Sequence, residues 1–210
     1  MRAIACLVTV VSSLVLAGTA TAADWPDGRL DAVATAIAGH PVHVFCEADQ
    51  GAWNAHFYNR GQAPWSVFGF TSLGSPVVYM SPDVCLHLHL LLDFGWLEGG
   101  IAKSALAVMT LTHEAIHQRG IGDERETQCL TLQLVGQVAQ EYFGLSPTVT
   151  VQQPTIVTKS KVVRRKGQRI VVTYRTTELR SVEVANPAVQ RFDEWVLAWH
   201  RTLPAPYQGC

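Results

Sequence analysis

Residues 101–118 read IAKSALAVMTLTHEAIHQ, and this stretch decides the fold of the chain. Most of its residues favour helix, and residues 104–112 carry no charged side chain. A helix of this composition is apolar on nearly every side, so it is buried nearly all round. We therefore expect a central helix over residues 101–118, ended by Gly120, with the rest of one domain packed around it.

The same stretch contains the pentapeptide His113-Glu114-Ala115-Ile116-His117. Two histidines four residues apart lie on one face of a helix, and this H-E-x-x-H spacing lets both imidazoles reach one Zn²⁺ ion. Glu114 lies beside them and can take a proton from a water molecule that the metal acidifies. Polar side chains on a buried helix need partners, which either a metal or neighbouring protein groups would provide.

A catalytic zinc site needs a third protein ligand and an open position. Three acids follow the motif, at the start of a helix that we expect from Asp123 to Phe143. At about 100° per residue, Glu124 shares the apolar, inward face of this helix, whereas Glu126 points towards solvent. Glu124 is therefore the expected third ligand, and Asp123 is the alternative.

Asp123 has two further readings. It completes the pattern H-E-x-x-H-x-x-G-x-x-D, which resembles the metzincin signature with Asp as third ligand, but no Met follows Met109 to form a Met-turn. With Glu126 it also fits a capping box at the start of the helix. The stabilising role at the helix start is the simpler one.

The N-terminus has the pattern of an export signal. Arg2 is followed by an apolar run of roughly 15 residues and by Ala20-Thr21-Ala22, an A-x-A cleavage site. The run is shorter than the roughly 20 residues that a membrane span requires. We expect residues 1–22 to be a cleaved signal peptide, residues 23–210 to form one domain, and the mature protein to be secreted without a stable membrane span.

Four cysteines remain after cleavage, and in an exported chain an even number favours disulfides. Four cysteines allow three pairings. We expect Cys46–Cys85, which would tie neighbouring element ends, and Cys129–Cys210, which would fasten the C-terminal tail to a helix.

The remaining segments predict an α+β fold. Residues 28–38 read as a helix and 41–46 as a strand; 47–65 read as a loop, and 67–71 and 76–81 as two strands. Helices are expected after Pro82-Asp83 and Asn186-Pro187. We expect a small, mostly antiparallel sheet packed on the H-E-x-x-H helix and a second helix. In zincin-like proteins, which the H-E-x-x-H motif resembles, the strand before the metal helix runs along the cleft. The resemblance implies that Pro76–Ser81 is this strand and that its free edge could pair with an extended peptide.

Residues 155–178 differ from the rest of the chain. Two β-rich runs flank Lys166-Gly167, which predicts an inserted hairpin. Eight of the 16 basic residues lie between Lys159 and Arg180, with Glu178 as the only acid. The hairpin is either a solvated element with charged edges or an arm for an anionic cell-surface polymer. A net charge of −1 argues against a general nucleic-acid binder.

The signal sequence, PVHVFC, PVVYMSPDVC, LTHEAIHQRGIGDERETQC and the terminal Cys210 together resemble a family of small exported zincin-type, gluzincin-like metallopeptidases of high-GC Gram-positive bacteria. The resemblance implies His113 and His117 as zinc ligands, Glu114 as the base and a nearby Glu as third ligand. That Glu maps onto Glu124 or, alternatively, onto position 128, where this chain has Gln.

The sequence thus predicts a secreted zinc metallopeptidase that acts on a peptide or protein substrate. Tyr142, Tyr174, His200 and Tyr207 are candidates for stabilising an oxyanion. One alternative is a catalytically inactive binding module that uses the basic hairpin on an anionic partner. Another is a closed zinc site that serves stability alone, with Gln128 or Asp123 in the fourth position.

Overall fold

The computed structural model describes residues 28–57, 67–96, 100–204, 207 and 210. The expected signal peptide lies outside the described residues. The fold is α+β, as expected, with helices and strands of the following bounds: α1 (Gly28–Ala38), β1 (His43–Cys46), α2 (Gln50–Phe57), β2 (Gly69–Thr71), β3 (Val77–Met80), α3 (Pro82–Phe94), α4 (Ile101–His117), α5 (Glu124–Phe143), β4 (Thr148–Arg165), β5 (Gln168–Ala185) and α6 (Pro187–His200).

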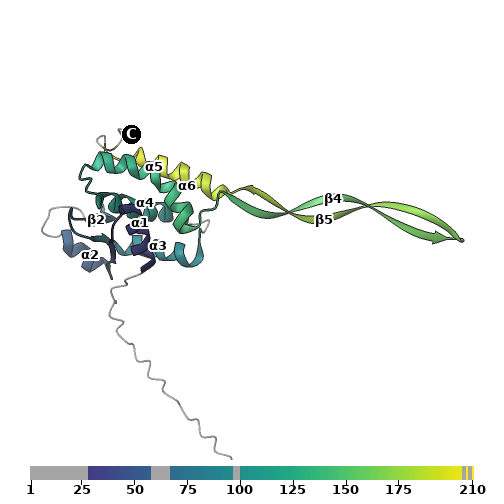
Figure 1. Cartoon of the computed structure of the whole chain (residues 1–210), viewed down its shortest axis with the longest axis horizontal. Coiled ribbons are helices and arrows are strands. Elements are labelled where there is room, and N and C mark those ends of the chain that lie inside the picture. Colours follow the sequence, from purple (N-terminus) through teal and green to yellow (C-terminus); the bar gives the residue numbers. More distant parts are fainter. Residues whose placement is uncertain (1–27, 58–66, 97–99, 205–206, 208–209) are drawn as a thin grey trace, which may run out of the picture.

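The molecule has two parts of different construction (Figure 1). We call β4 and β5 with their connecting turn, residues 148–185, the ribbon, and the remaining described residues the body. The ribbon projects from the body as a long twisted pair of strands. No helix among the described residues is both long enough and apolar enough to cross a bilayer.

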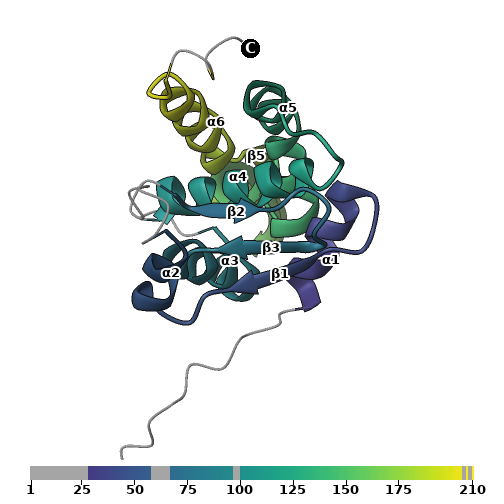
Figure 2. The ribbon, with the colours of Figure 1, turned by 90° about the vertical axis from the view of Figure 1, so that its left-hand side faces the viewer.

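Helix α4 is the centre of the body, as its composition predicts. It lies between the small sheet on one side and the α5–α6 pair on the other (Figure 2), and it also contacts α1 and α3. Of its 17 residues, 13 are buried, including Leu111, Ala115 and Ile116. Burial of this helix on several sides gives the domain one continuous core.

The small sheet has three strands, with β3 in the centre. Its order is β1-β3-β2, with β1 parallel and β2 antiparallel to β3, so this sheet is mixed. The expectation of a free edge on the strand 76–81 is therefore wrong, because β3 is hydrogen-bonded on both sides. The outer strand next to α4 is β2, whose hairpin turn to β3 contains Gly74 at φ +84°.

The expected loop 47–65 contains a helix. Residues 50–57 form α2, which buries Trp53 and Phe57 one helical turn apart. The Asp49 carboxylate accepts a hydrogen bond of 2.8 Å from the backbone N–H of Ala52 and so caps the helix start. Only two residues of α2 are buried, so the sequence has too few apolar positions here to show a helical period. Residues 58–65 lie outside the described residues.

Both expected disulfides are present. Cys46 at the end of β1 bonds to Cys85 in the first turn of α3, and Cys129 in α5 bonds to Cys210. The first crosslinks the sheet to a helix on which it packs. The second holds the end of the chain against α5, beside the site described below.

The ribbon is longer than the predicted hairpin. It spans residues 148–185 in continuous antiparallel register, with Lys166 and Gly167 at the turn, as expected. The prediction of 155–178 was too short because residues 148–154 and 179–185 contain Gln, Pro and Ser beside the β-branched residues that marked the strands. At its base, the backbone N–H of Asn186 donates to the carbonyl of Pro147 at 2.9 Å.

Candidate metal centre

Helix α4 delivers His113 and His117 on one face of its last turns. The backbone turns sharply after the helix at Gly120, whose φ of +85° suits glycine. Gln118 Nε2 donates to Thr71 Oγ1 of β2, and Arg119 Nε donates to the Ile37 carbonyl at 2.7 Å. These bonds fix the end of α4 against the sheet and α1, which holds the two imidazoles in place.

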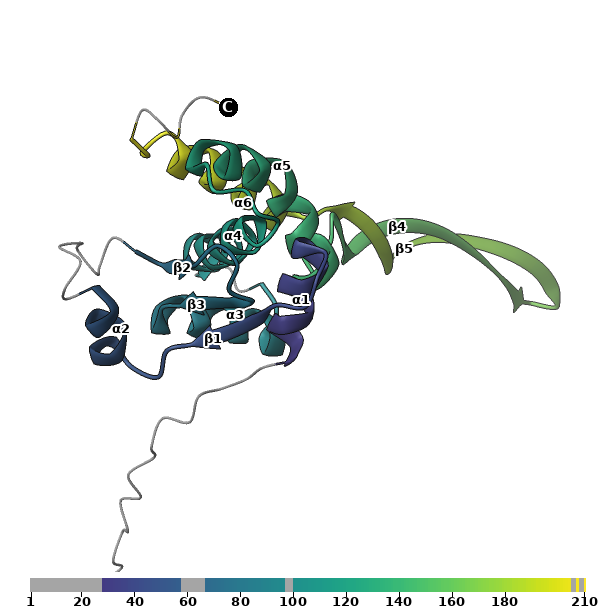
Figure 3. The same cartoon turned by 60° about the vertical axis from the view of Figure 1, so that its left-hand side comes forward.

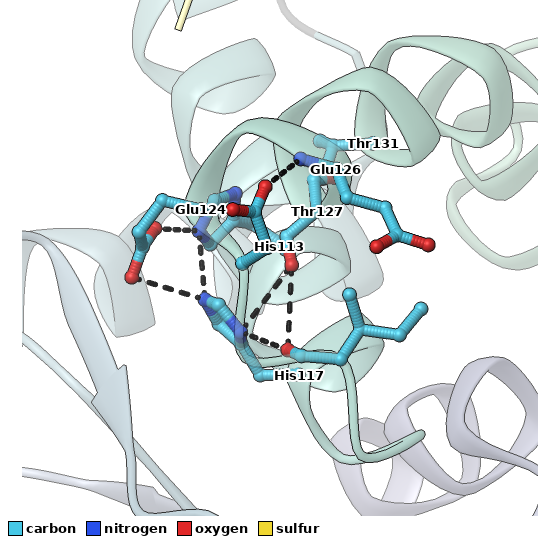
Figure 4. Close-up of polar contacts among 8 residues, drawn as sticks. His113, His117, Glu124, Glu126, Thr127 and Thr131 are labelled. Carbon is cyan, nitrogen blue, oxygen red and sulfur yellow. Dashed lines mark hydrogen bonds and ion pairs between the residues drawn. The ribbon is translucent and has the colours of Figure 1, made fainter. Parts of the chain in front are cut away.

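Helix α5 delivers the third residue. Asp123 is its N-cap, and the Asp123 carboxylate accepts a hydrogen bond of 2.8 Å from the backbone N–H of Glu126. The simpler reading of Asp123 is therefore the one observed: its carboxylate is engaged in capping. Glu124 is the first residue of the helix and turns towards the two histidines, whereas Glu126 points away (Figure 4).

The three side chains converge closely. His113 Nε2 lies 3.1 Å from His117 Nε2 and 3.1 Å from Glu124 Oε2, and His117 Nε2 lies 3.5 Å from Glu124 Oε1. One ligand atom from each residue falls within 4.8 Å of the others. Glu124 keeps 54% of its side chain exposed, because it lies at an open helix end and not on a buried face as its position on the helix suggested.

The tautomer of His117 is fixed by its other ring nitrogen. A carbonyl can only accept, so His117 Nδ1 donates to the Ile121 carbonyl at 2.7 Å, and Thr127 Oγ1 lies 3.3 Å from the same nitrogen. When the imidazole is neutral, Nε2 then carries the lone pair that faces the other two ligand atoms. A hydrogen bond of this kind orients metal-binding histidines in proteins.

Electrostatic coupling within the group is strong. Hydrogen bonds from His113 and His117 hold the pKa of the Glu124 carboxyl well below its usual range. Burial lowers the pKa of His117, but its hydrogen bonds to Glu124 and to the Ile121 carbonyl outweigh burial and raise it overall. The group is thus a carboxylate facing two imidazoles, and its donor set of two nitrogens and one oxygen suits a divalent metal ion.

Glu114 lies on the same turn but in a different environment. It is buried against β2, and a Cβ added to Gly69 would lie 3.0 Å from Glu114 Cγ. Burial raises the pKa of the Glu114 carboxyl to about 7, and the positive charge of His113 and His117 limits that rise. A carboxyl of this kind can hold or release a proton near neutral pH.

A cleft of about 550 Å³ opens in front of these residues. Gly69 and Thr71 of β2 form part of one wall, Trp199 of α6 and Leu203 after it contribute to another, and His113, Glu114, His117 and Glu124 lie along the same cleft. The three converging side chains of His113, His117 and Glu124 are therefore open to the cleft and not closed off by protein. Gln128, which the resemblance offered as the alternative ligand position, is buried and lines the same cleft.

The sequence predicted that His113, His117 and Glu124 lie together, but it did not predict which other residues line the cleft. Of the four oxyanion candidates only Tyr207 lines it; burial raises the Tyr207 pKa, and the charge of Glu124 adds to the rise. Trp199 of α6 packs against the core and also lines the cleft. The position of Tyr207 could have been predicted from Cys210, because the bond of Cys210 to Cys129 holds the C-terminal tail beside the first turns of α5.

Comparisons of the chain with protein-family models, with curated proteins and with solved structures find no match. The function must therefore be argued from the site itself.

Proposed function

We propose that this protein is an exported zinc metallopeptidase whose ligands are His113, His117 and Glu124 and whose general base is Glu114. One observation carries the proposal: three ligand atoms converge within 4.8 Å at an open cleft, with a buried carboxyl on the adjacent residue. Two His and one Glu are a ligand set of known catalytic zinc peptidases. The two disulfides are compatible with export.

Each residue has a defined task in this proposal. A bound Zn²⁺ ion would supply the Lewis acidity that polarises a peptide carbonyl and acidifies a water molecule. Glu114 accepts the proton of the attacking water on its carboxylate and gives that proton to the leaving amine. Tyr207 lies at the cleft, where its hydroxyl could donate to the oxygen of the attacked carbonyl.

The outer strand β2 is the expected docking edge for substrate. It pairs with β3 on one side only, and Gly69, Phe70 and Thr71 all line the cleft. An extended peptide can add to the free edge of a sheet through backbone hydrogen bonds. We therefore propose peptide or protein segments in extended form as substrates, aligned along β2 and not along β3.

Metal content is the first test. The folded, disulfide-bonded protein should contain about one zinc per chain by elemental mass spectrometry, and His117→Ala should lose it. His43→Ala is the matched control, because His43 is an exposed histidine of β1 outside the cleft. Absence of zinc from the wild type, even after incubation with zinc, would remove the proposal.

Turnover is the second test. Glu114→Gln should retain zinc while peptide hydrolysis falls by about 10²–10⁴-fold or more, the usual contribution of a general base. The assay is cleavage of a mixed peptide library followed by mass spectrometry. If the wild type has no peptidase activity and unfolds when its zinc is removed, a zinc site that serves stability alone is favoured instead.

A further inference from the structure

The charge of the ribbon is concentrated at one end. Residues 159–175, which we call the tip, contain seven Lys and Arg and no acid. The remainder of the ribbon contains only one basic residue, Arg180, and two acids, Glu178 and Glu183. The rest of the chain has eight basic residues against fifteen acids, so the tip has a net positive charge while the remainder of the protein has a net negative one.

Protection of a strand edge does not explain this distribution. Charged side chains that prevent edge-to-edge pairing would be needed along the whole length of an exposed strand. Residues 148–158 of β4 are equally exposed at their edge, yet none of them is charged. Edge protection therefore does not explain the concentration of basic residues at the tip, which indicates a role specific to the tip.

The four cations closest to the turn of the tip lack a carboxylate partner. Arg164 is directly paired with Arg169 across the ribbon, an arrangement that destabilises a hairpin by like-charge repulsion. Within the described part of the chain no carboxylate forms an ion pair with Arg164, Arg165, Lys166 or Arg169. Lys159 reaches Glu178, and Lys161 lies over the Tyr174 ring at 5.6 Å.

The strand register distributes these charges around the tip. Directly paired residues share a face and successive residues alternate, so Arg164, Arg169 and Arg175 lie on one face. Lys159, Lys161 and Arg165 lie on the other, with Lys166 at the turn. A planar surface could engage only one of these faces, whereas a flexible chain can engage both. The four arginines also suit phosphate, which a guanidinium binds through two parallel hydrogen bonds.

The tip is far from the cleft. Helix α5 begins at Glu124 in the cleft and ends near the ribbon, and its 20 residues span about 30 Å. Helix α6 begins at the ribbon and carries Trp199 at the cleft. Each strand of the ribbon has 18 residues, so the ribbon is about 60 Å long. Figure 3 shows that it extends away from the body. A ligand at the tip would leave the cleft open.

We infer that the tip is a binding site for a linear, phosphate-bearing polymer of the cell surface, which holds the protein in place while its cleft faces away. This inference does not depend on the proposed peptidase activity. The positive charge surrounding the tip favours a polymer that wraps it over a flat anionic membrane. Binding through several phosphates releases counterions and therefore weakens steeply with salt.

The test uses fluorescein-labelled long-chain polyphosphate and the full mature chain, with fluorescence anisotropy as readout. Wild type should bind, and affinity should fall about 10²-fold or more between 50 and 200 mM NaCl, as expected for roughly five or more phosphate contacts. Replacement of Lys161, Arg164, Arg165, Lys166 and Arg169 by Gln should weaken binding at 50 mM NaCl at least ~10²-fold. Glu114→Gln and chelation should leave binding unchanged.

The matched control keeps the charge and exchanges its carriers: Lys161→Arg, Arg164→Lys, Arg165→Lys, Lys166→Arg and Arg169→Lys. It should bind within about threefold of wild type, since the salt-dependent term follows charge. Equal binding by the Gln variant, or no saturable binding by wild type, overturns the inference. So does tighter binding to vesicles containing phosphatidylglycerol, or to duplex DNA, than to polyphosphate. Circular dichroism checks that each variant keeps its strands.

Discussion

The body buries most of its apolar residues, whereas the ribbon exposes its own. Every buried residue of the described chain lies in the body, whereas β4 and β5 contain none. Nine of the exposed large hydrophobic residues lie in the ribbon, including Ile156, Val171 and Leu179. Packing can therefore account for the sequence of the body, whereas the ribbon is held by its backbone ladder and by exposed cross-strand side-chain contacts such as Lys159 with Glu178 and Gln152 with Ser181. An isolated two-stranded hairpin is marginally stable in water, so the ribbon is shaped by requirements other than folding.

Two matched leucines give the largest expected contrast. Leu111 in α4 is fully buried, so Leu111→Ala should reduce the free energy of unfolding by about 2–5 kcal/mol through lost burial and a cavity. Leu179 in β5 is 68% exposed, and Leu179→Ala should change it by no more than about 0.5 kcal/mol. Thermal melts of both variants compare the two regions directly. A large loss in Leu179→Ala would mean that the ribbon packs against something in solution.

Gly69 allows β2 to lie close to the turn of α4 that carries Glu114. A Cβ at this position would lie 2.8 Å from Thr110 Cγ2 and 3.0 Å from Glu114 Cγ, so Gly69→Ala must displace the strand or the carboxyl. Overpacking of this kind costs about 1–3 kcal/mol. We expect a lower melting temperature and reduced peptide turnover, with zinc content preserved because His113, His117 and Glu124 are untouched.

Gly136→Ala is the control for this substitution. A Cβ at Gly136, within α5, has no neighbour within 4 Å, and Ala is the better helix former by about 0.5–1 kcal/mol. Its melting temperature should therefore rise slightly and its turnover should not change. Equal turnover in Gly69→Ala and Gly136→Ala would show that the packing of β2 on Glu114 does not matter to the site.

The sequence was most informative where the composition or spacing of residues within one helix or strand is enough to predict a structural feature. The apolar composition of residues 101–118 predicted the burial of α4, and the spacing of His113 and His117 predicted their shared face. The helical position of Glu124 separated it from Glu126, as observed. Both disulfide pairings were also predicted: one ties the end of β1 to the first turn of α3, and the other fastens the C-terminal tail to α5.

The sequence was least informative where distant segments meet. The order β1-β3-β2 depends on how three short strands pair, and no local pattern in residues 43–80 encodes that order. Tyr207 and Trp199 reach the cleft only because α6 packs on α4 and Cys210 is bonded to α5. Burial also failed as a guide at Glu124, because this residue is the first of α5 and its side chain is 54% exposed.

Removal of the ribbon should have the smallest effect on the body and is the strictest test of their separation. Residues 150–183 can be replaced by Asn-Gly, which leaves Val149 paired with Val184 and forms a short hairpin turn. The base remains closed because Asn186 donates to the carbonyls of Pro147 and Ser146 at 2.9 and 2.7 Å. The ends of α5 and α6 should therefore keep their positions.

The free energy of unfolding of the shortened protein should lie within about 1 kcal/mol of the wild-type value, and its melting temperature should shift by no more than roughly 2–4 °C. Zinc content and peptide turnover should be unchanged, while polyphosphate binding should be lost. Loss of zinc on shortening would instead mean that the ribbon stabilises the start of α5 across the length of that helix. Because α5 and α6 each contact α4 along the core, the packing of these three helices and not the ribbon should hold the metal-binding group together.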